Sequence, residues 1–155
     1  MKDEHYLAAA SGYYDLGMME EALQELTHLP ESKQNEPEVM MLETAIRIKA
    51  GDWKEGYTLA EKLSLQMPKH PAPWLDMAFC LHEMGKTQEA LDCLLTGPEA
   101  LKKEAIYFYN LACYEARLGS LKEAREHLDS AISLQSEFLK YSRKDPDLAP
   151  LYQTQ

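Results

Sequence analysis

The chain has 155 residues, with 16 Lys or Arg against 26 Asp or Glu, so its formal net charge at pH 7 is −10. Such an acidic chain argues against nucleic acid or an anionic membrane as a partner, because both are bound through basic patches. The hydrophobic content of 45% is normal for a folded domain and argues against disorder.

Glycines recur along the chain at intervals of 34 residues, and each is followed four positions later by a glutamate and then by a small residue. They are Gly17, Gly51, Gly85 and Gly119. An apolar pattern of helical period precedes each one, and a glycine just past a helix can adopt the left-handed conformation that ends it. Each repeat is therefore predicted to be a helix, a tight turn and a second helix.

Two of the turns carry a capping box, in which a cap side chain and a glutamate each bind a free backbone N–H. The pairs are Asp52 with Glu55 and Ser120 with Glu123. Both predict the start of a second helix at the residue after the cap.

The repeats occupy residues 3–36, 37–70, 71–104 and 105–138. Their pattern resembles that of the tetratricopeptide repeat (TPR) family, which the third repeat matches with Trp74, Met77, Ala78, Leu81, Ala90 and Leu94. The resemblance implies an all-α fold, a TPR α-solenoid. Four helix-turn-helix repeats would stack as a right-handed superhelix, with residues 1–155 forming a single domain.

The second repeat departs from the family pattern, because Glu43 and Arg47 stand at two normally apolar positions. They are four residues apart with the glutamate first, which is the favourable order for an ion pair on a helix. The preferred interpretation is a rotated helix that turns this pair to solvent, exposes Thr44 and buries Leu42 and Ile46. The alternative is a partly buried pair between repeats.

Prolines predict where the second helices end. Leu29-Pro30 and Gly97-Pro98 should stop them early in repeats 1 and 3, whereas those of repeats 2 and 4 can extend to about Gln66 and Gln135. The linkers 30–36 and 98–103 should be the most irregular segments.

After the last repeat, residues 139–155 are expected to cap the exposed end of the stack. Phe138, Leu139, Leu148 and Leu151 supply the apolar contacts in this prediction. The Asp-Pro-x-Leu-x-x-Leu sequence that begins at Asp145 resembles the ending of many bacterial TPR proteins, and we interpret it as structural.

No pattern of catalytic or cofactor-binding residues is present. The sequence lacks GxxxxGK[ST], GxGxxG and Gly-x-Ser-x-Gly, and its histidines form no HxxxH arrangement. A metal site from Cys80, His82 and Cys113 is weaker than the alternative of core thiols and a polar groove histidine. We therefore expect no enzyme activity, no cofactor and no metal.

The resemblance also implies a binding groove, because the first helix of each TPR lines a concave surface with three of its positions. In this chain they are Leu7, Ser11, Tyr14, Met41, Ala45, Ile48, Leu75, Phe79, His82, Tyr109, Cys113 and Ala116. The set is unusually apolar for a surface facing solvent, which is typical of an interface. Phe79 and Tyr109 are the predicted hot spots.

These residues predict a non-catalytic scaffold that binds an apolar or amphipathic protein segment in its groove. The Lys and Asn clamp of co-chaperone TPR domains is absent. One alternative is a secretion-type TPR chaperone, although the first repeat is expected to begin at about Asp3, which leaves no room for the helical extension that such chaperones usually carry. Another is a self-associating structural subunit. Three cysteines without a CxxC pair, and no signal-peptide or membrane-spanning stretch, favour the cytoplasm.

Overall fold

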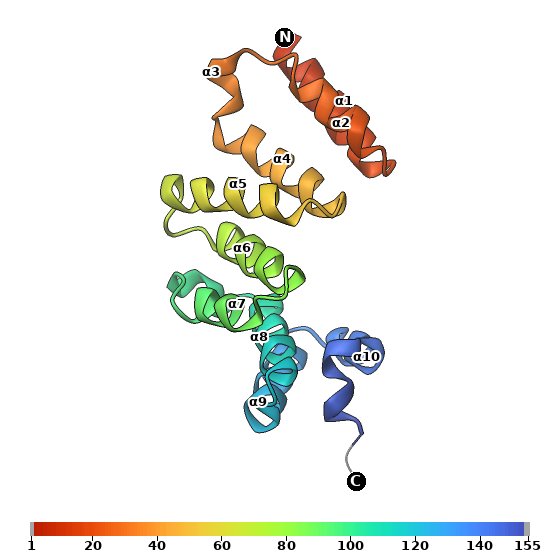
Figure 1. Cartoon of the computed structure of the whole chain (residues 1–155), viewed down its shortest axis with the longest axis vertical. Coiled ribbons are helices and arrows are strands. Elements are labelled where there is room, and N and C mark those ends of the chain that lie inside the picture. The colour runs from red at the N-terminus through yellow and green to blue at the C-terminus, as the bar shows by residue number, and fades with distance from the viewer. Residues whose placement is uncertain (1, 154–155) are drawn as a thin grey trace. The chain divides into compact units, whose positions relative to one another are not determined.

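The computed structural model describes residues 2–153, which form helices and turns with no strand among them. These helices fall into two compact units (Figure 1). Unit 1 ends at Pro68 and unit 2 begins at Lys69, between the second and third expected repeats.

Unit 1 contains two helical hairpins joined by a short helix. Its elements are α1 (Lys2–Asp15), α2 (Met19–Leu26), α3 (Glu31–Gln34), α4 (Pro37–Lys49) and α5 (Trp53–Gln66). The α1–α2 and α4–α5 pairs pack along their lengths, and α2 also contacts α4. Ala10, Ala22, Leu26 and Ile46 belong to the core of this unit. The small side chain of Ala22 follows the turn glutamate and lets α1 and α2 approach closely.

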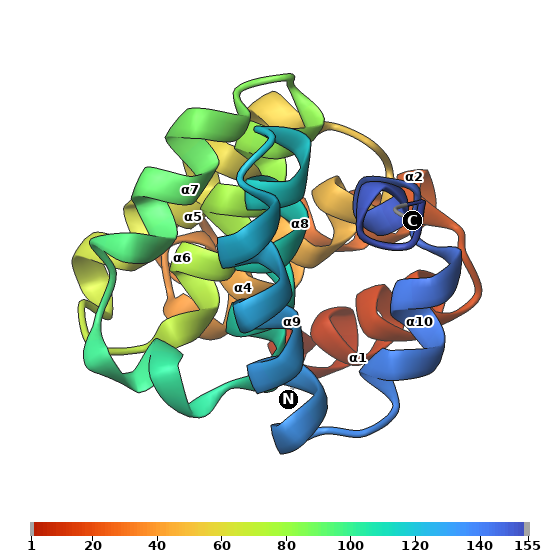
Figure 2. The ribbon, with the colours of Figure 1, turned by 90° about the horizontal axis from the view of Figure 1, so that it is seen from below.

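Unit 2 contains two further hairpins and a C-terminal segment. Its elements are α6 (Pro71–Glu83), α7 (Thr87–Leu95), the 3-10 helix η1 (Glu99–Lys103), α8 (Ala105–Arg117), α9 (Leu121–Leu134), α10 (Phe138–Lys144) and the 3-10 helix η2 (Pro146–Leu151). Figure 2 shows the chain leaving α9, forming α10 and then turning into η2. From there η2 contacts α8 and α9.

All four turn glycines have the predicted conformation, with φ values of 77°, 80°, 82° and 88°. At Gly85 the backbone N–H donates to the carbonyl of His82, and the next N–H reaches back to Leu81, so the turn closes the end of α6. The glycines that recur every 34 residues therefore each end a helix by adopting the left-handed backbone conformation.

Substitution of Gly85 by alanine is expected to lower the free energy of unfolding by about 1–2 kcal/mol, the cost of a left-handed conformation for a residue with a Cβ. The matched control is Gly12→Ala. A Cβ at Gly12 meets open space and the residue lies inside α1, so this change should stabilise by about 0.5–1 kcal/mol. Urea unfolding of both variants is the measurement. If both substitutions changed the free energy of unfolding in the same direction, the role of Gly85 as a left-handed turn residue would be contradicted.

The second repeat follows the alternative interpretation. Glu43 and Arg47 form a partly buried ion pair, with Oε2 and Nη2 3.5 Å apart. The prediction for Thr44 was wrong, because its side chain is fully buried and its hydroxyl donates to the Met40 carbonyl at 2.6 Å. That bond satisfies the hydroxyl, so threonine is accepted inside the repeat. Ile46 is buried as predicted, and Leu42 is half-buried.

The prolines mark the helix ends as predicted. The second helices of repeats 1 and 3 stop at Leu26 and Leu95, whereas those of repeats 2 and 4 extend to Gln66 and Leu134. The two linkers are more ordered than expected, because they contain α3 and η1. These turns place backbone N–H groups of the linkers on neighbouring carbonyls, as Lys33 does with Pro30.

One of the two predicted capping boxes has a side-chain cap. The Asp52 carboxylate accepts a hydrogen bond from the Glu55 backbone N–H at 3.4 Å. The prediction for Ser120 was wrong, because its side chain forms no cap bond. Its backbone N–H instead donates to the Glu115 carbonyl at 2.8 Å, which closes the turn.

A histidine–glutamate pair connects the two helices of the fourth repeat. His127 Nδ1 on α9 lies 2.5 Å from Oε1 of the buried Glu115 on α8. The pKa of His127 is raised above its usual 6.5, mainly by this hydrogen bond and despite partial burial, with a further contribution from the Glu115 charge. The pair is therefore strongest when the imidazole is protonated.

This pair predicts a pH-dependent stability. Because the folded-state pKa of His127 is raised, its contribution is complete below about pH 6.5 and is lost as the pH rises through the raised value. Tm measured across pH 5–9 should fall more steeply on the alkaline side for the wild type than for His127→Gln. A wild type and variant with parallel profiles would contradict the assignment.

Candidate functional site

The predicted groove positions of unit 1 lie on α1 and α4, which contact each other. Ser11 and Met41 are exposed, whereas Leu7, Tyr14, Ala45 and Ile48 are half-buried. Leu7 and Tyr14 also pack against the core of this unit. Met41 therefore offers the most accessible apolar side chain of the set, being 37% exposed.

A lysine covers part of this surface. Lys49, at the end of α4, donates from Nζ to the Tyr14 carbonyl at 2.9 Å and lies 4.3 Å from the centroid of the Tyr14 ring. The contact orients Tyr14 and adds a positive charge beside an apolar ring. The surface of unit 1 thus combines an exposed thioether, an aromatic ring and a cation.

In unit 2 the expected groove positions lie on α6 and α8. Leu75, Phe79 and His82 on α6 are half-buried, whereas Tyr109, Cys113 and Ala116 on α8 are buried. The difference has a clear cause, because the C-terminal segment of α10 and η2 returns to α8. This part of the expected groove is covered by the chain itself.

The C-terminal segment is held on α8 by ring packing and by carboxylates. The Phe138 ring stacks on Tyr109 with centroids 4.6 Å apart. The Tyr109 hydroxyl donates to Asp145 Oδ2 at 2.8 Å. On α6, His82 Nε2 lies 2.9 Å from Asp147 Oδ2. The two aspartates thus connect the segment to both first helices of the unit.

Apolar burial completes the cap, largely as predicted. Leu148 and Leu151 are buried, and Arg125 of α9 donates to the Leu151 carbonyl. The prediction for Leu139 was wrong, because this side chain is 39% exposed. Phe138 instead makes the contact at the start of α10, since its ring reaches Tyr109.

A cavity of about 480 Å³ lies between α6, α8 and the C-terminal segment. Its lining includes the predicted groove residues Phe79, His82, Tyr109 and Cys113, together with Asp145, Pro146 and Asp147. The structure therefore brings four of the predicted positions to one place. Sequence analysis missed Asp145 and Asp147 as site residues, although the Asp-Pro sequence at the tail was the signal that could have identified them.

The cavity is electronegative. Burial raises the pKa of the Cys113 thiol and of the Tyr109 hydroxyl, and Asp145 raises both further through hydrogen bonding and its charge. Arg117 Nε lies 3.5 Å from Asp147 Oδ1, but its side chain is 58% exposed. The lining thus combines neutral thiol and phenol groups with three carboxylates, those of Glu83, Asp145 and Asp147.

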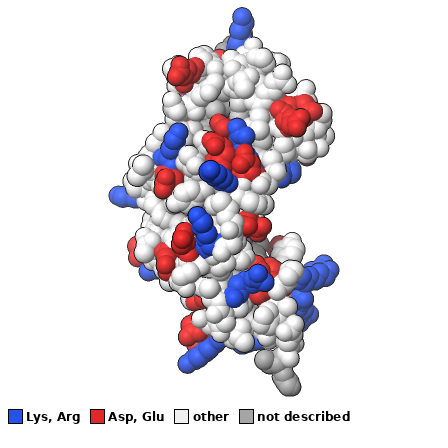
Figure 3. All heavy atoms as spheres, in the orientation of Figure 1, with Lys and Arg blue, Asp and Glu red and all other residues white. Residues whose placement is uncertain are grey.

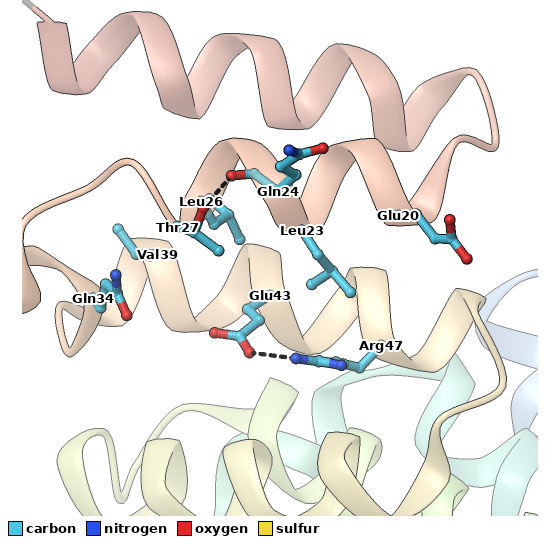
Figure 4. A pocket seen from close by; sticks show the side chains of 9 residues that line it. All are labelled: Glu20, Leu23, Gln24, Leu26, Thr27, Gln34, Val39, Glu43 and Arg47. Carbon is cyan, nitrogen blue, oxygen red and sulfur yellow. Dashed lines mark hydrogen bonds and ion pairs between the residues drawn. The ribbon is translucent and has the colours of Figure 1, made fainter.

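A second cavity, of about 430 Å³, lies within unit 1 between α2 and α4 (Figure 4). Leu23 points across it, and the Glu43–Arg47 pair lies at its edge. Arg47 Nη1 also contacts Asp52 Oδ2 at 3.3 Å, but its Nε is buried without a hydrogen-bond partner among the described residues. The two charged residues that depart from the repeat pattern therefore line a seam between repeats.

Figure 3 shows acidic and basic side chains interspersed on the visible surface of both units, with Lys and Arg gathered at α10. Lys140, Arg143 and Lys144 of that helix are exposed. This mixture is typical of a solvated outer surface.

Comparison with known proteins identifies the repeats. Residues 47–112 match the family model described as tetratricopeptide repeat. No curated protein matches the sequence significantly. No helix among the described residues has the length and apolar character needed to cross a membrane.

Solved structures agree with this match. MamA 41-end from Desulfovibrio magneticus RS-1 is 22% identical, with a TM-score of 0.77 over 98% of this chain and 90% of that one. A thermophilic TPR protein from Thermus thermophilus is 18% identical, with a TM-score of 0.78 over 97% of this chain and 81% of that one. The predicted all-α TPR solenoid fold is confirmed.

Proposed function

Because this chain is a tetratricopeptide repeat protein, we propose that it is a non-catalytic scaffold whose first-helix surface binds an apolar or amphipathic segment of a partner protein. The first-helix surface is defined by the twelve groove positions given above. In this proposal the four repeats, 3–36, 37–70, 71–104 and 105–138, act together as one domain. TPR folds serve protein–protein interaction. Our proposal adds that the partner binds on the first-helix surface.

The observation that carries the proposal is the C-terminal segment on α8. It is a short helical segment with an aromatic anchor, Phe138, and acidic hydrogen-bond acceptors, and it covers three groove positions of the fourth repeat. The chain therefore contains an example of the kind of segment that this surface accommodates. A partner segment of similar chemistry would place an apolar side chain against ring and thioether groups.

The residues chosen for a test must be accessible on this surface and must not hold the C-terminal segment in place. Tyr109 is unsuitable, because its side chain supports the C-terminal segment. Met41 is exposed and its flexible side chain can adapt to a partner, and Tyr14 is half-buried on the neighbouring first helix. Aromatic side chains and methionine are the types enriched in interfaces.

Affinity capture from the native host, with mass spectrometry of the retained proteins, tests the proposal. Tyr14→Ala combined with Met41→Ala should retain a specific partner at least about tenfold less than the wild type, as expected when an interface anchor of ~1.4 kcal/mol or more is removed. Leu65→Ala is the matched control, since Leu65 is 80% exposed on the second helix α5.

A folded double variant that retains every partner as tightly as the wild type would overturn the assignment to this surface. Loss of the partner in the Leu65→Ala control alone would place binding on the second helices instead. The cytoplasmic setting belongs to the proposal, and it agrees with the lack of a disulfide among the cysteines of the described residues.

A further inference from the structure

Three potential metal ligands converge on the cavity of unit 2, and a histidine lies beside one of them. One ligand atom each from Cys113, Asp145 and Asp147 lies within 4.8 Å of the others. His82 Nε2 approaches the same group and lies 2.9 Å from Asp147 Oδ2. The ligands come from three elements, with His82 on α6, Cys113 on α8 and the aspartates around the start of η2. These ligands are far apart in the sequence, so they match no metal-binding motif that is defined by residue spacing.

The spacing suits a tetrahedral ion. Zinc binds thiolate at ~2.3 Å and imidazole or carboxylate at ~2.0–2.2 Å, so its ligand atoms stand roughly 3.3–3.7 Å apart. Cys113 Sγ lies 3.7 Å from Asp145 Oδ2, and the His82–Asp147 separation of 2.9 Å is slightly shorter. Cys113, Asp145 and Asp147 could therefore reach one ion, and His82 would join them by moving its ring from Asp147 towards the ion.

The charge of the cavity favours a cation. Asp145 and Asp147 are only half-exposed, and the guanidinium near them is largely in solvent. Tyr114 packs its ring 4.8 Å from the His82 ring, and its buried hydroxyl in the cavity wall has no hydrogen-bond partner among the described residues.

We propose that Cys113, Asp145, Asp147 and His82 form a binding site for a zinc-type divalent cation. Binding replaces the thiol proton of Cys113, which is released to solvent, and the neutral imidazole of His82 supplies its Nε2 lone pair. The two hydrogen bonds within the cluster are exchanged for metal–ligand bonds. The ion then fastens the C-terminal segment to α6 and α8.

The ligand set differs from the metal site that sequence analysis considered. Cys80 is fully buried and does not line this cavity, whereas the two aspartates do. The proposal therefore departs from the expectation of no metal, because it keeps His82 and Cys113 and replaces Cys80 with the two aspartates. A single cysteine with one histidine and two carboxylates is a donor set that zinc and cobalt both accept.

Titration of the full-length, chelator-treated protein with Co²⁺ tests the proposal under a non-thiol reductant. Binding should give a near-ultraviolet thiolate-to-cobalt charge-transfer band that saturates at one equivalent and disappears when Zn²⁺ is added. Cys113→Ser should lose the band. Cys93→Ser is the matched control and should keep it, since Cys93 is half-buried and contacts the Trp74 carbonyl.

Asp147→Asn provides a second variant that does not alter the thiol. It should weaken Co²⁺ binding by about tenfold or more, and Zn²⁺ should raise the Tm of the wild type more than that of this variant. If circular dichroism shows that Cys113→Ser does not fold, the Asp147→Asn affinity decides the question.

Three results would overturn the proposal. They are the absence of a band in the folded wild type, a band that persists unchanged in Cys113→Ser, and a band lost equally in Cys93→Ser. In each case the cluster would be a hydrogen-bonded attachment of the tail and nothing more.

Discussion

Leu148→Ala is expected to lower the free energy of unfolding by about 2–5 kcal/mol, because it removes a fully buried side chain and leaves a cavity. Leu148 lies in η2, which contacts both helices of the fourth repeat. The substitution therefore acts on the packing that holds the C-terminal segment in place. Urea unfolding followed by circular dichroism measures the effect.

Leu139→Ala is the control, since the same truncation is made at a side chain that is 39% exposed. Its cost should stay within about 1 kcal/mol, the range of most substitutions outside a core. Equal losses for the two leucines would mean that the cap packs through α10 as much as through η2, contrary to the structure.

Tyr114→Ala is expected to cost about 3–5 kcal/mol, the range for removing a large ring from a core. Tyr114 is 2% exposed and is among the largest fully buried side chains. Its ring also packs against His82. Thermal and urea unfolding of the full chain should both show the loss.

Tyr114→Phe separates the ring from the hydroxyl. That hydroxyl is buried and has no hydrogen-bond partner among the described residues, so removing it should be neutral or stabilising by about 1 kcal/mol. A loss above ~1 kcal/mol for Tyr114→Phe would show that the hydroxyl is satisfied, for example by a buried water.

The helix order was predictable because the signal is local and repeated. A glycine with positive φ is needed at each turn, and a small residue must follow the turn glutamate, as Ala22 does in the core of unit 1. Prolines at the linkers also act through the backbone of their own segment. The same local reasoning fails for Thr44, whose burial depends on a hydrogen bond to Met40 that composition does not reveal.

The site was predictable only in part. The repeat frame indicates which positions share a surface, and four of them do line one cavity. It does not indicate that the tail returns to cover α8, because that contact joins Tyr109 to Asp145, which lies 36 residues further along the chain and after the last repeat. The aspartates of the tail could therefore be identified as site residues only from the three-dimensional structure.

Site-specific photo-crosslinking in the native host tests the central claim most directly. A photoreactive amino acid replaces Met41 on the first-helix surface or, in the control, Leu65 on α5. The proposal predicts a discrete crosslinked partner from position 41 and none from position 65. Binding on the first-helix surface would be contradicted if the folded protein crosslinked a partner from position 65 and not from position 41. It would also be contradicted if position 41 gave no crosslink at all.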